Sequence, residues 1–225
     1  MNYGLGRKSS VDWRDLNFPL AEHPKLKAAR PYILTKRYWW SSGHWGDQGL
    51  SSQCVAYAWL HWMEDGPVTW SPREPGSGFL YDPAEIYRKA QRLDVWPGED
   101  YNGTSVRAGA KVLKQLGVIK DYRWSSKLRD VIEAVLYVGP VVVGTDWHES
   151  MFTPDKDNFI KPTGGIAGGH AYVINGVNTK RGCFRIKNSW GREWGNVGHA
   201  YIQFGHFRDL MQAQGEVCLA TEVIS

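Results

Sequence analysis

The sequence predicts an α+β fold of two lobes, helical in its first half and built of antiparallel strands in its second. An uninterrupted apolar helix pattern follows Cys54, and further capped helix patterns continue to about residue 138. From residue 139 onward, short runs rich in β-branched and aromatic residues alternate with glycine turns. No internal repeat or low-complexity linker separates the two halves, so we expect one domain over residues 11–225.

Composition and charge limit the classes of function. With 225 residues, of which 42% are hydrophobic, the chain can bury a sizeable core. The 27 basic and 23 acidic residues leave a net charge of only +4, and the excess is scattered, so we expect no nucleic-acid partner. No apolar run approaches the roughly 18 residues of a membrane span, so we expect no membrane partner either.

The three cysteines, Cys54, Cys183 and Cys218, form an odd set without CxxC spacing. Neither a disulfide framework nor a zinc cage is indicated, and at most Cys183 and Cys218 would pair. We therefore expect no metal and no cofactor. Because no basic-then-apolar leader opens the chain, the prediction is a cytoplasmic protein of a reducing compartment.

Residues 1–10 are small, polar and basic, and are predicted to form a flexible N-terminal arm. Ordered structure is expected to begin at Val11. The helical lobe is predicted over about 45–138, and the β lobe over about 139–225 together with the N-terminal segment.

Cys54 is predicted to lie in the first turn of a helix that ends at Gly66. The run over 55–63 is apolar on nearly every face, which indicates a buried helix. Ser51 and Ser52 are N-cap candidates, because a hydroxyl accepts from the free N–H groups of the first turn. The partial positive charge at this end favours a thiolate over a thiol, so Cys54 is a candidate nucleophile.

The remaining helices and strands are predicted from helix-cap residues and from strand-forming runs that alternate with glycine turns. Asp82 and Pro83 suit the cap and the first position of a helix. Helices are predicted over 82–90, about 104–117 and 126–138. Strands are predicted at Val141–Gly144, His170–Asn175, Cys183–Lys187 and Gly198–Ile202, with a further strand at Cys218–Ala220.

A cysteine nucleophile needs a base, an orienter for that base and donors for the oxyanion. His170 opens a predicted strand after two glycines, which leave space at its imidazole. Asn188, eighteen residues later, ends the next strand pair, so a hairpin of this length brings its amide oxygen beside the imidazole. Trp190 is expected to shield that hydrogen bond from water. Gln48 is expected to complete an oxyanion hole with the backbone N–H of Cys54.

Each of these features alone is more often structural, but their joint occurrence in this order resembles the papain-like cysteine peptidases (family C1). The resemblance rests on Gln48…Cys54, Gly169-His170-Ala171 and Asn188-Ser189-Trp190-Gly191, and runs from Val11-Asp12-Trp13-Arg14 to the end. It implies Cys54 as nucleophile, His170 as general base and acid, Asn188 as orienter and Gln48 as oxyanion donor. It also implies a helical lobe and an antiparallel β-barrel-like lobe, with substrate in the cleft between them.

The segment 86–118, with Gly103-Thr104-Ser105-Val106-Arg107 before a helix, resembles bacterial and viral members more than plant or lysosomal ones. Two departures also separate the chain from the secreted members of the family. Those members have a disulfide-bonded cysteine three positions before the nucleophile and an aromatic residue directly after it, where this chain has Ser51 and Val55. Only ten residues precede Val11, so the long inhibitory pro-segment is not expected. The prediction is that control of activity comes from elsewhere.

The predicted function is therefore hydrolysis of peptide bonds by a cysteine peptidase, acting as a monomer through a covalent acyl-enzyme on a peptide or protein substrate. Two alternatives stay open: a Cys-His amidase or peptidoglycan hydrolase, and an inactive papain-like module that binds peptides. The glycine-rich segment before His170 should line the cleft, and Ile166 and Ala167 suggest an apolar subsite. The predicted substrate-binding residues are Gly169, Ile166, Ala167 and Trp190.

Overall fold

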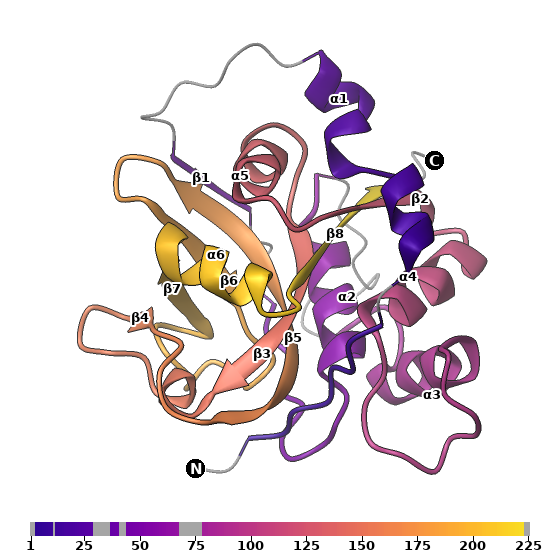
Figure 1. Ribbon diagram of the computed structural model, residues 1–225. Coiled ribbons are helices and arrows are strands. Elements are labelled where there is room, and N and C mark those ends of the chain that lie inside the picture. The colour runs from indigo at the N-terminus through magenta and orange to yellow at the C-terminus, as the bar shows by residue number, and fades with distance from the viewer. Residues whose placement is uncertain (1–2, 11, 29–36, 41–43, 68–77, 223–225) are drawn as a thin grey trace.

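The computed structural model describes residues 3–10, 12–28, 37–40, 44–67 and 78–222 (Figure 1). Val11, where ordered structure was expected to begin, lies outside these ranges. The helices are η1 (Trp13–Asn17), η2 (Leu20–Glu22), α1 (Pro24–Lys27), α2 (Cys54–Asp65), α3 (Pro83–Leu93), α4 (Val106–Gln115), α5 (Leu128–Tyr137), η3 (Glu149–Phe152) and α6 (Phe204–Gln212). The strands are β1 (Arg37–Trp39), β2 (Ile119–Ser125), β3 (Val141–His148), β4 (Phe159–Ile160), β5 (Ile166–Asn178), β6 (Cys183–Lys187), β7 (His199–Gln203) and β8 (Glu216–Glu222).

The predicted α+β class is confirmed. Helices α2, α3 and α4 lie together on one side of the molecule. The curved sheet lies on the other side, together with α5 and α6 (Figure 1). The strand order is β2-β8-β3-β5-β6-β7-β4, with β1 paired to β5. Neighbouring strands are antiparallel except β4 and β7, which are parallel. Among the described residues the sheet stays open instead of closing into a barrel.

Two apolar clusters meet at the central strands. Alternate residues of a strand point to opposite faces, and β5 divides in this way: Tyr172 and Ile174 join the cluster of the β lobe, while Ala171 and Val173 join the cluster around α2. Strand β5 is therefore buried on both faces. This position places the residues of β5 between the two lobes.

Helix α2 is buried along nearly its whole length, as its apolar pattern predicts. Its two interior tryptophans satisfy their indole N–H groups on main-chain carbonyls: Trp59 donates to Val106 at 2.9 Å and Trp62 to Pro140 at 3.0 Å. The helix begins at Cys54, but its N-cap is Gln53 and makes no side-chain cap hydrogen bond. The predicted cap residue Ser51 instead donates its hydroxyl to the carbonyl of Gln48.

A fully buried ion pair joins the end of α2 to the end of β6. Lys187 Nζ lies 2.7 Å from Asp65 Oδ1, and both side chains are inaccessible to solvent. Asn175 Nδ2 donates to the other carboxylate oxygen of Asp65 at 2.7 Å. Because Lys187 directly precedes Asn188, this pair fixes the start of the loop that carries Asn188 against the helix that carries Cys54.

Replacing Asp65 with alanine is expected to lower the free energy of unfolding by about 3–5 kcal/mol, because the Lys187 ammonium would stay buried without its carboxylate. Urea denaturation followed by tryptophan fluorescence measures the change. The control is Glu85→Ala, which breaks an exposed pair with Lys89 on α3 and should change stability little, since water screens such pairs. Equal losses in the two variants would contradict the expected role of the buried pair.

Candidate active site

Cys54 is the first residue of α2, and its side chain is fully buried. Burial raises the pKa of its thiol to about 12, although the nearby backbone groups of Ala171, Gly6 and Val55 act to lower this pKa. The resting group is therefore a thiol, whereas the helix N-terminus alone favours a thiolate.

His170 is held by Asn188 through one ring nitrogen. The His170 Nε2 atom lies 2.8 Å from Asn188 Oδ1, which also accepts from the backbone N–H of Ser189 at 2.7 Å. Because an amide oxygen only accepts, Nε2 carries the hydrogen, and the Nδ1 of the neutral ring is unprotonated. The antiparallel pairing of β5 with β6 brings the two residues together, as the hairpin spacing predicts. His170 does not open its strand, however, because β5 already begins at Ile166.

Aromatic rings enclose the imidazole of His170. The ring of Trp190 stacks on it with the centroids 4.7 Å apart, and Trp147 approaches edge-on at 4.8 Å. His170 is fully buried, and burial lowers its pKa to about 4 although the hydrogen bond to Asn188 acts in the opposite direction. The ring is therefore neutral at physiological pH and can accept a proton at Nδ1.

No hydrogen bond joins Cys54 to His170 in the described parts of the chain, and Nδ1 has no hydrogen-bond partner there. Cys54 instead packs in one apolar cluster with Ala171, the residue next to His170. The structure thus brings His170 to Asn188 and places Cys54 against the same strand. It holds the thiol and the imidazole as separate neutral groups.

Gln48 connects the loop before α2 to the segment after β6. Its Nε2 donates to the carbonyl of Gly4 at 3.1 Å and to that of Ser51 at 2.6 Å. Its Oε1 accepts from the hydroxyl of Ser189 at 2.5 Å, and its backbone N–H donates to the carbonyl of the same residue at 2.8 Å. These bonds fix the side-chain amide of Gln48, so that one of its N–H groups points at the carbonyl of Gly4.

That carbonyl belongs to the N-terminal arm, whose residues Gly4 to Lys8 make main-chain hydrogen bonds, whereas the prediction was a flexible arm over residues 1–10. In Figure 1 the arm runs along the lower side of the molecule from beneath the sheet toward the helices. The N–H groups of Gly6 and Arg7 both donate to the carbonyl of Gly169, at 3.1 and 2.9 Å. On the opposite side, the N–H of Thr104 donates to the carbonyl of Gly6 at 2.8 Å. The carbonyl of Thr104 accepts from the N–H of Lys8, also at 2.8 Å. The arm therefore lies in a groove between the two lobes.

Glycines explain why the arm fits so closely. A Cβ atom at Gly6 would collide with the carbonyl oxygen of Ser52, and one at Gly4 with that of Ser51. The bare face of this extended segment lets its backbone reach the walls of the groove. The signal in the sequence is the pair of glycines at alternate positions, but the partners of the arm lie far away along the chain.

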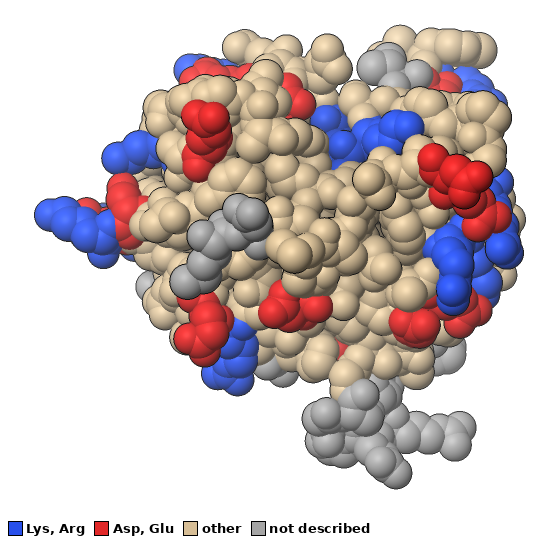
Figure 2. All heavy atoms as spheres, turned by 90° about the horizontal axis from the view of Figure 1, so that it is seen from below, with Lys and Arg blue, Asp and Glu red and all other residues tan. Residues whose placement is uncertain are grey.

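The outer end of the arm covers Trp190. The ring of Tyr3 stacks on Trp190 with the centroids 4.4 Å apart, and Trp190 Nε1 donates to the carbonyl of Gly4 at 3.2 Å. The same side of the molecule, seen from below, is largely uncharged at its centre and carries residues of both signs toward its edges (Figure 2). This face therefore presents no extended surface of one sign of charge.

The predicted substrate-binding residues divide into two groups. Gly169 and Trp190 both bind the arm through hydrogen bonds. Ile166 is 62% exposed and Ala167 is exposed as well, and the apolar subsite that they suggest stays a prediction. They lie at the outer end of β5, where solvent reaches both.

The three cysteines are buried and form no disulfide, so the possible pair of Cys183 and Cys218 is not formed. Within the described residues, no group of three or more His, Cys, Asp or Glu side chains is arranged to hold a metal ion. The described helices include none that is both long enough and apolar enough to cross a membrane.

A cysteine at the start of a buried helix, packed against a strand whose histidine is held by an asparagine after the next strand, defines the papain-like class of two-lobed proteins. Solved structures agree with this fold. Xylellain, a cysteine protease from Xylella fastidiosa, superposes with a TM-score of 0.74 at 20% identity and covers 99% of this chain and 97% of its own. Digestive procathepsin L2 proteinase from Tenebrio molitor gives a TM-score of 0.67 at 18% identity, covering 97% and 78%.

Residues 82–220 match the papain family cysteine protease description, and the chain belongs to this family. The matched range contains His170 and Asn188, but not Cys54. A cathepsin B-like cysteine proteinase from Caenorhabditis elegans is 24% identical over 166 residues, which are 66% of this chain and 42% of the relative. An uncharacterized peptidase C1-like protein from Acanthamoeba polyphaga mimivirus is 27% identical over 136 residues, or 58% and 42%. The chain thus spans less than half the length of these curated relatives.

Proposed function

We propose that the chain is a cysteine peptidase that hydrolyses peptide bonds through a covalent acyl-enzyme on Cys54. The observation that carries the proposal is the placement of His170. Asn188 holds its Nε2, its Nδ1 has no hydrogen-bond partner among the described residues, and Cys54 packs in one apolar cluster with the next residue of the strand, Ala171. Nδ1 is thus the nitrogen available to take the thiol proton.

Displacement of the arm is the first step of the mechanism. Water then enters a site where burial keeps the thiol pKa high and the imidazole pKa low. Hydration moves both pKa values toward their ordinary ranges. When Sγ and Nδ1 come within hydrogen-bond distance, the proton passes from Cys54 to His170 and leaves a thiolate beside an imidazolium.

Acyl transfer follows from this ion pair. The thiolate attacks the carbonyl carbon of the substrate, a C–S bond forms, and the carbonyl oxygen becomes an oxyanion that accepts from Gln48 Nε2 and the backbone N–H of Cys54. His170 returns the proton to the nitrogen of the scissile bond, which breaks and releases the amine. Water, deprotonated by His170, then attacks the thioester and restores the thiol. The hydrogen bond from Gln48 to the Gly4 carbonyl supports this role, because its N–H already binds a peptide carbonyl in the groove.

The groove favours a peptide over the cell-wall substrate of an amidase or peptidoglycan hydrolase. It holds the arm as an extended peptide through main-chain hydrogen bonds to Gly169 on one side and Thr104 on the other. Such bonds recognise a backbone of any sequence. We further propose that the protein works in a reducing compartment such as the cytoplasm, an assignment that three cysteines outside any disulfide support.

Alkylation of the folded full-length chain tests the proposal against an inactive binding module. Iodoacetamide is expected to modify Cys54 at least about tenfold faster than Cys183 or Cys218, because Cys54 needs only local displacement of the arm whereas the other two lie in the core. The three rates are measured by mass spectrometry of proteolytic peptides. His170→Ala should slow the reaction of Cys54 alone. Equally slow modification of all three thiols would contradict catalysis at Cys54.

A further inference from the structure

A second hollow lies outside the groove, between η1, α4 and β2, and we name it the η1 pocket. Its volume is about 260 Å³, and side chains from or next to all three elements line it. Arg107, Lys111 and Lys114 are three and four positions apart on α4, so they stand on one face of this helix. The aromatic part of the lining consists of Phe18, Tyr122 and Trp124.

The carboxylates of the η1 pocket already have partners within the chain. Asp12 accepts from the Nε and Nη2 atoms of Arg14, at 2.8 and 2.6 Å. Asp15 is paired with Arg107, whose guanidinium also lies 3.9 Å from Asp12. Asp121, the third carboxylate, accepts from a main-chain N–H at 2.8 Å and lies 3.5 Å from an arginine of the same strand. The pocket therefore holds no carboxylate that needs a cation from a ligand.

Two cations of the pocket have no carboxylate partner among the described residues. Lys111 donates to a main-chain carbonyl at 3.2 Å, and the ammonium of Lys114 lies 5.9 Å from the centre of the Tyr122 ring. Together with Arg14 and Arg107, four cations line the pocket against three carboxylates, which leaves one positive charge in excess. This balance favours a ligand with a single negative charge.

Two buried donors of the lining also lack an acceptor. Arg107 Nε and Trp124 Nε1 have no hydrogen-bond partner in the parts of the chain that the structure describes. The two residues are only 6% and 7% exposed, and the guanidinium carbon lies 4.6 Å from the centre of the indole. Buried polar groups in native proteins are nearly always hydrogen-bonded, so an orphaned donor indicates an acceptor supplied from outside. The missing partner is thus an oxygen, as in a carboxylate.

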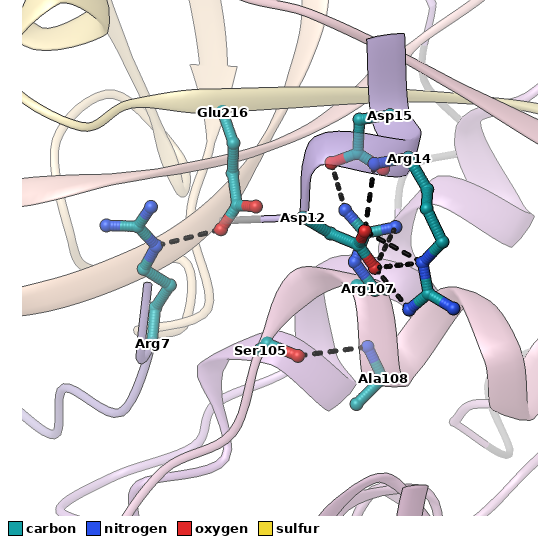
Figure 3. A network of polar contacts seen from close by, with 8 residues as sticks. All are labelled: Arg7, Asp12, Arg14, Asp15, Ser105, Arg107, Ala108 and Glu216. Atoms are coloured by element: carbon teal, nitrogen blue, oxygen red, sulfur yellow. Dashed lines mark hydrogen bonds and ion pairs between the residues drawn. The ribbon is translucent and has the colours of Figure 1, made fainter. Parts of the chain in front are cut away.

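The η1 pocket is separate from the groove. Figure 3 shows the ion pair of Arg7 and Glu216, which holds the arm, to the left of the view, whereas the network around Arg107 lies to the right. Arg7 Nε lies 3.0 Å from Glu216 Oε1, and another nitrogen of Arg7 donates to a main-chain carbonyl at 2.7 Å. A ligand in the η1 pocket therefore leaves these contacts of the arm in place.

Apolar side chains stand exposed beside the η1 pocket. Trp13 and Leu16 are 73% and 83% exposed, and their spacing puts them on one face of the 3-10 helix η1. Phe18 is 49% exposed and belongs to the lining itself. Large apolar groups gathered at one exposed place mark an interaction surface. A free inorganic anion would leave them in water, whereas a peptide with a ring next to its acid would bury part of them.

We propose that the η1 pocket docks a peptide segment of a partner protein in which an acidic residue adjoins an aromatic one. The carboxylate binds Lys111, Lys114 and the orphaned donors, and the aromatic ring packs against Phe18. Docking uses neither Cys54 nor the groove, so the inference goes beyond the proposed peptidase function and does not rest on it.

Isothermal titration calorimetry with the full-length Cys54→Ala chain tests this docking site. Three peptides share one glycine–serine frame and contain aspartate–phenylalanine, asparagine–phenylalanine or aspartate–alanine. They are acetylated and amidated, so that the aspartate side chain is their only charge. The aspartate–phenylalanine peptide is expected to bind at least about fivefold more tightly than either of the others, as for one ion pair or one aromatic contact.

Replacing Lys111 and Lys114 together with glutamine should reduce the preference for aspartate to within about twofold. The matched control is Lys120→Gln, an exposed lysine of β2 outside the lining, which should retain the preference. Phe18→Ala should remove the preference for phenylalanine and keep that for aspartate, and thermal melts establish that each variant is folded. Equal binding of the three peptides would overturn the docking site. A preference for aspartate that persists without both lysines, or that is lost equally in Lys120→Gln, would also overturn it.

Discussion

Replacing Cys54 with alanine is expected to lower kcat/KM for peptide hydrolysis by at least about 10⁴-fold. The sulfur supplies the only bond through which the proposed acyl-enzyme forms, and a methyl group can neither attack a carbonyl nor carry an acyl group. The residual rate would come from binding and from the oxyanion donors alone. A fluorogenic peptide assay with purified protein measures the loss.

The matched controls are Cys183→Ala and Cys218→Ala. Both residues are buried thiols of the same chain, in β6 and β8, and neither contributes to the groove. Each variant should keep its activity per folded molecule, although removing a buried sulfur atom from the core lowers the free energy of unfolding. Activity that survives in Cys54→Ala, or that disappears equally in all three variants, would contradict a nucleophilic role for Cys54.

Gly6→Ala is expected to accelerate both the alkylation of Cys54 and peptide hydrolysis. The new methyl group would collide with the carbonyl oxygen of Ser52, and the nearest atoms are all main-chain atoms of that residue, which leave little room for adjustment. Overpacking of this kind costs about 1–3 kcal/mol. If that cost falls on docking of the arm, the open state becomes about 5- to 150-fold more populated, and both rates should rise by a similar factor.

Gly205→Ala is the control for this variant, because an added Cβ atom at Gly205 in α6 meets nothing within 4 Å. It should leave both rates unchanged. The rates are compared under identical conditions by mass spectrometry and by the fluorogenic assay. An unchanged or slower reaction in Gly6→Ala would contradict the conclusion that the arm controls access to Cys54.

The helices and strands that the sequence predicts are those whose signals lie in neighbouring residues. The apolar pattern of α2 and the Asp82 cap of α3 are read from neighbouring residues, and both elements form as predicted. The hairpin that joins His170 to Asn188 is also set by short spacing. Strand β2 and helix α6 were not predicted; β2 is defined by its pairing with β8, almost a hundred residues away along the chain.

The arm and the state of the thiol depend on distant residues. Small, polar residues before residue 10 indicate a loose segment, because nothing in their own sequence reveals Gly169 and Thr104 as hydrogen-bond partners. The start of α2 favours a thiolate at Cys54 by its local charge, but burial beneath the arm dominates and keeps the thiol protonated. The ion pair of Arg7 and Glu216 was missed for the same reason, since it forms only where the arm meets β8.

Trapping of the acyl-enzyme tests covalent catalysis at Cys54 most directly. The full-length chain carrying Gly6→Ala is mixed with an N-acyl peptide ester, quenched in acid within milliseconds and analysed by intact mass and peptide mapping. The mechanism predicts one added acyl group per molecule on Cys54, and none when Cys54 is replaced by alanine. Release of product without any adduct, or an adduct on another residue, would contradict it.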